Sequence, residues 1–304
     1  MRSSMLRARL LALVSLLWPV ATQAQTKAAC TFKFFSTTTN VTAPDGNPVY
    51  LQPLGIDDFG TIVGYIDRRS AGPVGVVRWA NGGVVRVSGT KGLDGRNDQG
   101  TMVGNRRVNS AWQAILVTGP TSSPTITPLV LDIPLDANAA VFPSGINKWG
   151  TVIGEYLNPD LSNAHGFKRW SNGTTHTLDF PGAAPNSTRA LGINDLGTVV
   201  GTYQHTHGGR NHGFILHNGQ WATLDYPNAG GTILVGITNS GQIIGNGGPS
   251  SVFLYENGTF KVISVPNSVP WLPPSLLSIS PKQGLILGRM SMAASSDGFV
   301  AKCQ

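Results

Sequence analysis

The sequence predicts an all-β fold, a six-bladed β-propeller of four-stranded antiparallel blades. One motif, close to G-I-N-D-x-G-x-V-V-G, recurs along the chain with a period of 40 to 50 residues, which is typical of solenoids and propellers. The first glycines of its six copies are Gly60, Gly100, Gly150, Gly197, Gly241 and Gly284. The composition of 38 Gly, 20 Pro and only 12% charged residues favours short strands and tight turns over long helices. A flat β-solenoid is the alternative.

One unit, residues 190–227, resolves into four strands. The segment ALGI is followed by a turn from Asn194 to Gly197 and then by TVVGTY. Asparagine can bond the backbone of such a turn and glycine can take a positive φ. The segments HGFILH and WATLDY flank Asn218-Gly219, which is a strong hairpin signal. Each unit is therefore predicted to be an up-and-down blade.

The two ends of the chain predict how the ring closes. The last copy stops after DGFVAKCQ and lacks a fourth strand, whereas CTFKFFS near the N-terminus is a strand without a blade. We expect this N-terminal strand to complete the sixth blade and remove an exposed edge. Cys30 and Cys303 fall at this seam and are predicted to form a disulfide worth about 4–5 kcal/mol. Two unpaired thiols are the alternative.

Residues 1–24 have the pattern of a cleaved signal peptide. An arginine-bearing start is followed by an apolar run over residues 10–20 and by small residues before a cleavage site after Ala24. The run is too short for a membrane anchor, so no membrane span is expected. The prediction is an exported protein, extracellular or periplasmic, with residues 25–304 as a single propeller domain.

The charge of the exported part is mild. Without the three arginines of the signal peptide, 19 basic and 15 acidic residues leave a net charge of +4. This balance argues against a nucleic-acid partner, because such binding depends on many phosphate contacts. A monomer is expected.

Two further elements accompany the repeat unit. They are the triads His165-Gly166-Phe167 and His212-Gly213-Phe214, and the L-D-x-P elements that begin at residues 131, 178 and 224. Together these features resemble the HAF repeats of bacterial exported proteins. The resemblance covers the whole exported part of the chain. It implies a propeller-like fold and an extracellular or periplasmic address. It implies no reaction.

Loops that vary in length and sequence are predicted to lie on one face of the ring. They are the loops between the second and third strands of each unit and the loops that connect successive units. Rigid scaffolds usually carry binding residues on such loops. Six arginines there could hold an anionic sugar, a carboxylate or a phosphate, or could simply be solvated. They are Arg68, Arg69, Arg106, Arg107, Arg189 and Arg210. Trp271, with Phe142 and Tyr50, could form a stacking platform for sugar rings, or Trp271 could pack over the end of the propeller.

Three histidines in QHTHGGRNH, His205, His207 and His212, could bind Zn or Cu. The alternative is that His212 holds its blade together, as its repeat position suggests, and that the other two are solvated. No other cofactor is expected.

Carboxylates give a weaker signal. Asp132, Asp179 and Asp225 recur at one blade position, which favours a structural role such as bonding a neighbouring turn. Glu155 and Asp160 are a possible pair for glycoside chemistry, although nothing fixes their separation.

The sequence contains no G-x-S-x-G elbow, H-E-x-x-H motif, P-loop, or G-x-G-x-x-G in a βαβ setting. The leading hypothesis is a non-catalytic binding module for a glycan, a cell-surface polymer or a protein. The alternative is a secreted hydrolase or lyase acting on a polysaccharide or related polymer, with a metal in one version. A structural component of the cell envelope is not distinguished from the first hypothesis by sequence.

Overall fold

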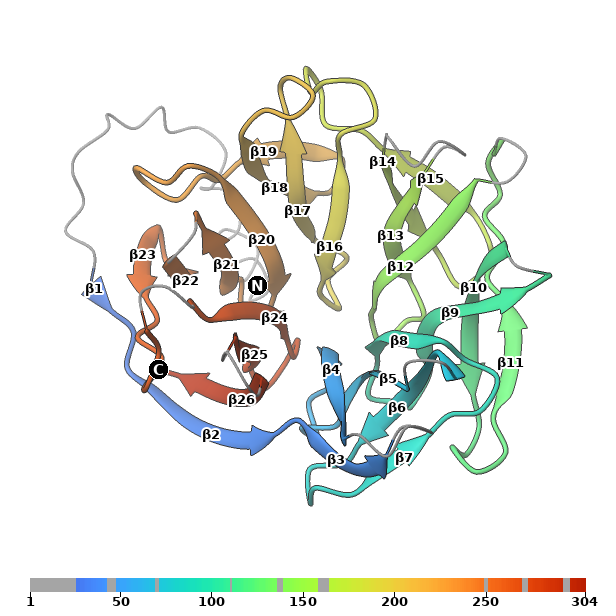
Figure 1. The fold of residues 1–304 in the computed structure, drawn as a ribbon. Coiled ribbons are helices and arrows are strands. Elements are labelled where there is room, and N and C mark those ends of the chain that lie inside the picture. The colour runs from blue at the N-terminus through green and yellow to red at the C-terminus, as the bar shows by residue number, and fades with distance from the viewer. Residues whose placement is uncertain are drawn as a thin grey trace, which may run out of the picture.

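The computed structural model describes residues 26–42, 48–68, 71–109, 111–135, 139–157, 164–248, 251–269, 273–291 and 296–304. Their strands form six sheets arranged in a ring, the six-bladed propeller that the sequence predicts (Figure 1). The predicted signal peptide and the candidate residues Arg69, Asp160 and Trp271 lie outside the described residues. Within these ranges no helix combines the length and the apolar character needed to cross a bilayer.

Four strands of each blade, a to d, run from the centre of the ring outward. Blade 1 contains β4 (Pro48–Ile56), β5 (Ile62–Asp67), β6 (Pro73–Arg78) and β7 (Val84–Arg86), and blade 2 contains β8 (Gly92–Arg96), β9 (Met102–Val108), β10 (Ala111–Thr118) and β11 (Thr125–Pro128). Blade 3 contains β12 (Ala140–Ile146), β13 (Val152–Leu157), β14 (Ala164–Arg169) and β15 (Thr175–Leu178), and blade 4 contains β16 (Arg189–Ile193), β17 (Val199–Gln204), β18 (Asn211–His217) and β19 (Gln220–Thr223). Blade 5 contains β20 (Thr232–Ile237), β21 (Ile243–Gly247), β22 (Ser251–Glu256) and β23 (Thr259–Val262). Blade 6 contains β24 (Ser275–Ile279), β25 (Leu285–Ser291), β26 (Ser296–Cys303) and, from the N-terminus, β2 (Cys30–Ser36).

The N-terminal strand closes the ring as predicted. β2 pairs antiparallel with β26 over seven residues, beginning with Cys30 opposite Cys303. These two cysteines form the expected disulfide, and their Cα atoms lie 4.0 Å apart. The pairing also supplies strand d of blade 6, so this blade has no unpaired outer edge on β26.

The N-terminal segment reaches further than the sequence predicts. β1 (Thr26–Lys27) pairs in parallel with β23 on the outside of blade 5. β3 (Thr38–Thr42) pairs with β4 in blade 1. The segment therefore joins blades 5, 6 and 1, and Figure 1 shows it as the blue ribbon along the outside of the ring.

The two glycines of the repeat have different roles. The first lies in the a–b turn with a positive φ, for example 80° at Gly197, which side chains with a Cβ adopt at a cost. The second lies on strand b, and in blades 3 to 6 it is opposite a phenylalanine of strand c, as Gly201 is opposite Phe214. Phe214 fills the space above Gly201 and is fully buried. The motif therefore encodes both a tight turn and a close contact between ring and backbone.

Asparagines of the a–b turns connect neighbouring blades. Oδ1 of buried Asn147 accepts hydrogen bonds from the amides of Trp149 and Thr151, at 3.1 and 3.0 Å. Its Nδ2 donates to the carbonyl of Asn194 in blade 4, at 3.1 Å. Asn97 and Asn194 make the same bond to the next blade. This belt satisfies buried polar groups that would otherwise be costly.

Three blades lack this asparagine. Blades 5 and 6 have Thr238 and Ser280 at its position, and blade 1 has a charged residue there. This residue is Asp57, and its carboxylate forms an ion pair with Arg96 of blade 2. Arg96 stands where the other five blades have isoleucine at the end of strand a. Burial lowers the pKa of Arg96, and Asp98 acts in the opposite direction.

The hydrophobic core is divided among the blade interfaces. Six clusters of buried side chains each join two adjacent blades. In one of them Phe35 and Leu287 of blade 6 pack with Leu51 and Ile66 of blade 1. This cluster seals the ring at the point where the chain ends meet, by the same burial of apolar area that joins the other blades.

Candidate functional site

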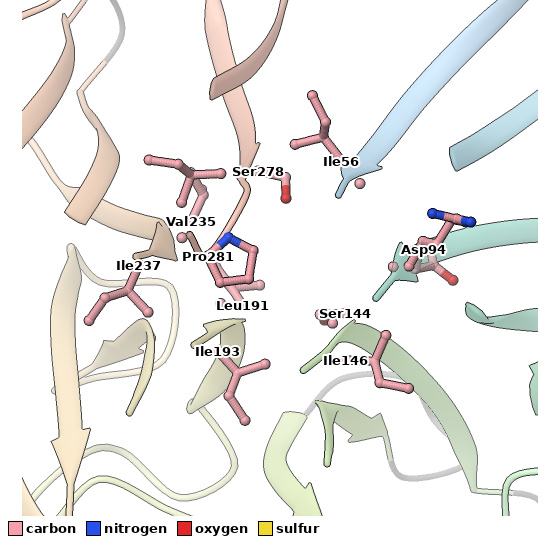
Figure 2. A pocket seen from close by; sticks show the side chains of 17 residues that line it. Ile56, Asp94, Ser144, Ile146, Leu191, Ile193, Val235, Ile237, Ser278 and Pro281 are labelled. Carbon is pink, nitrogen blue, oxygen red and sulfur yellow. The ribbon is translucent and has the colours of Figure 1, made fainter. Parts of the chain in front are cut away.

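The innermost strands of the six blades surround a central channel (Figure 2). A β-bulge interrupts the pairing of each strand a with strand b, for instance between Leu93 and Gly95. The channel contains a small cavity of about 40 Å³, lined mainly by glycine and aliphatic residues. Asp94, the bulged residue of blade 2, is the one carboxylate among its lining residues.

Asp94 is an unusual residue for this position. The bulged residues of the other blades are Leu54, Ser144, Leu191, Val235 and Leu277. Asp94 keeps part of its surface open to the channel, while its Oδ2 atom is covered and has no hydrogen-bond partner within the described residues. Burial raises the pKa of the Asp94 carboxyl to about 7. Such a carboxyl can hold or release a proton near neutral pH.

The upper face, which carries the b–c and d–a connections, has a hollow of about 320 Å³ that Asp94 also lines. We call it the aromatic hollow because three rings line it, those of Tyr65, Trp112 and Phe142. Its other lining residues are Leu54, Asp67, Pro73, Lys91, Gly92, Asp94 and Asn105. The rings of Trp112 and Phe142 lie 6.3 Å apart at an angle of 58°. Blades 1, 2 and 3 thus each contribute one aromatic side chain to one concave surface.

A second open hollow, of about 700 Å³, adjoins the first between blades 1 and 2. We call it the basic hollow because four cationic side chains line it. They are Arg68, Arg86, Lys91 and Arg107. Lys91 and Pro73 line both hollows. The guanidinium of Arg107 lies 4.6 Å over the ring of Trp112, a cation–π contact that joins the two surfaces.

The predicted arginine patch is brought together in part. Arg68 and Arg107 line the basic hollow, whereas Arg106 on the other side of β9 donates from Nε to Oε1 of Gln113, at 2.7 Å. Arg189 forms an ion pair with Glu155, 2.9 Å from Nε to Oε2. Nη2 of Arg210 lies 3.5 Å from Oδ2 of Asp225.

Glu155 of the predicted carboxylate pair lies on β13. Burial raises the pKa of Glu155, and the charge of Arg189 acts in the opposite direction. Glu155 is not among the residues that line the aromatic hollow. Asp160 lies outside the described residues, so the structure does not test the pair.

Of the three histidines of blade 4 predicted to bind a metal, two lie close together and the third does not. The rings of His205 and His212 lie 4.8 Å apart, and His207 is exposed on the loop. His212 Nδ1 lies 2.7 Å from the Asp225 carboxylate. Among the described residues no group of three His, Cys, Asp or Glu side chains is placed to hold a metal, and Zn or Cu binding stays a prediction.

The repeated His–Asp pair has an evident structural role. In blade 3 His165 Nδ1 lies 2.9 Å from Asp179, and its ring stacks on Tyr156. In blade 4 Asp225 bonds His212 and also accepts from the amide of Gly213. These bonds tie the end of strand d to strand c in blades 3 and 4, and for Asp132 of blade 2 the structural role stays a prediction.

Of the predicted aromatic platform, Phe142 lines the aromatic hollow. Tyr50 is half-buried near the start of β4 and is not among the lining residues, and Trp271 lies outside the described part of the chain. Sequence reasoning missed Tyr65, Trp112 and Asp94. Asp94 had a usable signal, since it replaces the apolar residue or serine of the other copies.

The fold is similar to that of a number of solved structures, and three of them illustrate the likeness. A gluconolactonase from Xanthomonas campestris has a TM-score of 0.51 and 10% identity, over 94% of this chain and 99% of that chain. A PQQ-bound aldose sugar dehydrogenase from Streptomyces coelicolor has a TM-score of 0.51 and 9% identity, over 92% and 100%. A Trypanosoma rangeli sialidase, in complex with the inhibitor DANA, has a TM-score of 0.50 and 9% identity, over 89% of this chain and 59% of that chain. At these identities the likeness concerns the fold alone.

No family model and no curated protein matches the chain. Membership of the HAF-repeat family therefore remains a prediction from the repeat itself.

Proposed function

We propose that this protein is a carbohydrate-binding propeller whose ligand occupies the aromatic hollow. The observation that carries the proposal is the convergence of Tyr65, Trp112 and Phe142 on one hollow at the upper mouth of the channel. The apolar faces of sugar rings pack on aromatic rings, and a volume of about 300–1,000 Å³ is usual for ligand sites. Asp67, Lys91 and Asn105 would supply polar contacts to hydroxyl groups.

The fold comparisons agree with this class of ligand. The gluconolactonase, the aldose sugar dehydrogenase and the sialidase are all named for sugar chemistry. A propeller places loops from several blades around one mouth, so the scaffold suits ligands that need contacts from many directions. The choice of carbohydrate over protein rests on the aromatic hollow and not on this likeness.

The test is binding of a glycan panel by the mature protein, followed by calorimetric titration of each hit. Trp112→Ala and Phe142→Ala should each weaken binding about tenfold or more, because stacking area is lost. The matched control is Trp149→Ala, since Trp149 is 63% exposed on an a–b turn at the opposite face. Hits that tolerate both upper-face variants, or that are lost only with Trp149→Ala, would refute the proposal.

A second candidate is a hydrolase or lyase acting on the same ligand. It is favoured by Asp94, which lines the hollow and whose carboxyl has a pKa raised by burial to about 7. General acid–base catalysis is most effective when the pKa lies near the working pH. Asp67 lines the same hollow and would be the second carboxylate that glycoside hydrolysis requires.

This candidate has its own test, the release of reducing ends or unsaturated products from polymers that bind. Asp94→Asn should abolish turnover and leave binding within about twofold, because the side chain keeps its shape and loses its titratable proton. Absence of turnover in the wild type with every bound polymer would leave the non-catalytic module as the function.

We also place the protein outside the cytosol. The Cys30–Cys303 disulfide is the supporting observation, because such bonds persist in oxidising compartments. N-terminal sequencing of the protein recovered from a bacterial host should give Gln25 as the first residue. Protein that keeps residues 1–24 after fractionation would contradict the predicted cleavage.

A further inference from the structure

The basic hollow carries a concentration of positive charge on the rim of the proposed carbohydrate site. Its four cations come from separate segments of two blades. Arg68 follows β5, Arg86 ends β7, Lys91 precedes β8, and Arg107 lies on β9. None of the described residues that line this hollow is acidic. Like charges held together in this way repel one another unless an anion offsets them.

Many cations elsewhere in the described part of the molecule have a carboxylate partner. Those with one within 4.0 Å are Arg96, Lys148, Arg189, Arg210, Lys261 and Lys282. Arg68, Arg86 and Lys91 have no such partner among the described residues. Arg68 makes one long bond to the carbonyl of Ala71, at 3.5 Å, and its Nε atom is buried with no hydrogen-bond partner. The hollow therefore has donor capacity that its own described residues do not use.

This capacity lies beside the stacking surface. Arg107 packs over the ring of Trp112, which lines the aromatic hollow, and Lys91 lines both hollows. A sugar stacked on Trp112 would direct its ring substituents toward these cations. The planar guanidinium group can donate paired hydrogen bonds to two oxygens of one anion, which gives it a preference for carboxylate, sulfate and phosphate.

We propose that the ligand is an anionic glycan, one that carries carboxylate or sulfate-ester groups, and that the basic hollow of Arg68, Arg86, Lys91 and Arg107 binds those groups. The inference rests on the proposed carbohydrate function and names its substrate class. Uronates and sulfated sugars share the chemistry that the hollow would recognise. Asp67 lines the adjoining aromatic hollow and is not among the residues that line the basic hollow.

The experiment compares three polymers by titration with the mature protein, namely polygalacturonate, dextran sulfate and neutral dextran. The test variant is Arg68→Gln/Arg86→Gln, which leaves Trp112 and Lys91 in place. The control variant is Lys33→Gln/Lys302→Gln, which removes the same charge from two exposed lysines of blade 6. Each variant is checked for an unchanged thermal unfolding midpoint.

The expected result is at least tenfold weaker binding of one or both anionic polymers by the test variant, and less than a twofold change in the control. The dependence of affinity on salt should also become shallower in the test variant, because fewer counterions are released. Loss with polygalacturonate alone identifies a uronate ligand, and loss with dextran sulfate alone identifies a sulfated one.

Three outcomes would overturn the inference. They are wild-type affinity for both anionic polymers in the test variant, an equal loss in the control variant, and tight binding of neutral dextran alone. If neutral dextran alone binds and Trp112→Ala removes that binding, the carbohydrate proposal holds but the ligand is not an anionic glycan. If anionic polymers bind through Arg68 and Arg86 but Trp112→Ala does not weaken that binding, the two hollows do not form one site.

Discussion

The ring of Phe214 lies directly against the backbone of Gly201. A Cβ atom on Gly201 would come within 2.8 Å of Cε1 of Phe214 on one neighbouring strand of blade 4, and still closer to the carbonyl oxygen of Arg189 on the other. The same pairing of glycine and phenylalanine recurs in other blades. The pairs are Gly154 with Phe167, Gly245 with Phe253, and Gly288 with Phe299. The second glycine of the repeat is therefore a packing residue, and in blades 3 to 6 an aromatic ring lies against it.

Replacing Gly201 with alanine should lower the free energy of unfolding by about 2–3 kcal/mol, because the added methyl group overpacks a core with no room to yield. Chemical denaturation followed by tryptophan fluorescence would measure the loss. Gly230→Ala is the matched control, since a Cβ there meets no atom within 4 Å. The control should stay within about 0.5 kcal/mol of the wild type. Equal losses in both variants would contradict the packing role.

The disulfide at the seam should contribute more than the strand pairing around it. Cys30→Ser/Cys303→Ser should reduce the free energy of unfolding by about 4–5 kcal/mol, because the bond joins residues 273 positions apart and closes that loop in the unfolded chain. The native ring should still close, since β2 keeps its other contacts with β26. Wild-type protein in reductant should reach the same denaturation midpoint as the double variant. A midpoint unaffected by either treatment would exclude the stabilising role.

The sequence predicted the blades well because their signals are local. Asn218 and Gly219, for example, form a hairpin turn with positive φ at both residues, and such a turn is readable from two letters. The closing strand and the disulfide were readable because the repeat count left one strand missing at one end and one extra at the other. These are properties of the order of residues along the chain.

The site was less predictable because it depends on how blades pack against one another. Tyr65, Trp112 and Phe142 come from three blades, and no spacing in the sequence places them at one hollow. Asp94 faces the channel through a one-residue bulge, which changes the direction of side chains along a strand and leaves no alternation to read. The parallel pairing of Thr26 with Lys261 likewise depends on the finished ring.

The ion pair between Asp57 and Arg96 replaces one link of the asparagine belt, and this substitution can be reversed. Arg96→Ile alone should cost about 3 kcal/mol, because it leaves the buried Asp57 carboxylate without its partner. Adding Asp57→Asn should recover most of that loss, because it gives blades 1 and 2 the isoleucine and asparagine of blades 3 and 4. The new side-chain amide of blade 1 would then donate to the carbonyl of Asn97, as the Asn97 amide does to the carbonyl of Asn147. Denaturant titration of both variants measures the recovery, and a double variant as unstable as the single one would show that blade 1 is not built on the common pattern.

The pKa of Asp94 makes stability depend on pH in a defined direction. Burial raises the pKa to about 7, so between about pH 4 and pH 7 the folded protein holds a proton that the unfolded chain has lost. The unfolded state then binds fewer protons, and the free energy of unfolding must fall as pH rises through this window. Above about pH 7 both states are ionised at this position, and the full cost of burying the charge remains.

Asp94→Asn removes this cost without changing the size of the side chain. We expect the variant to exceed the wild type by about 4 kcal/mol in free energy of unfolding at pH 8, because a rise in pKa from 3.8 to about 7 corresponds to that cost, and the difference to vanish below about pH 4. Denaturant titrations at pH 4, 6 and 8 would measure it. Ser144→Ala, at the matching bulge of blade 3, alters the channel without a titratable group and should keep the wild-type slope. A difference that is constant with pH would mean that the Asp94 carboxyl is solvated through the channel, and it would remove the main support for acid–base chemistry at this site.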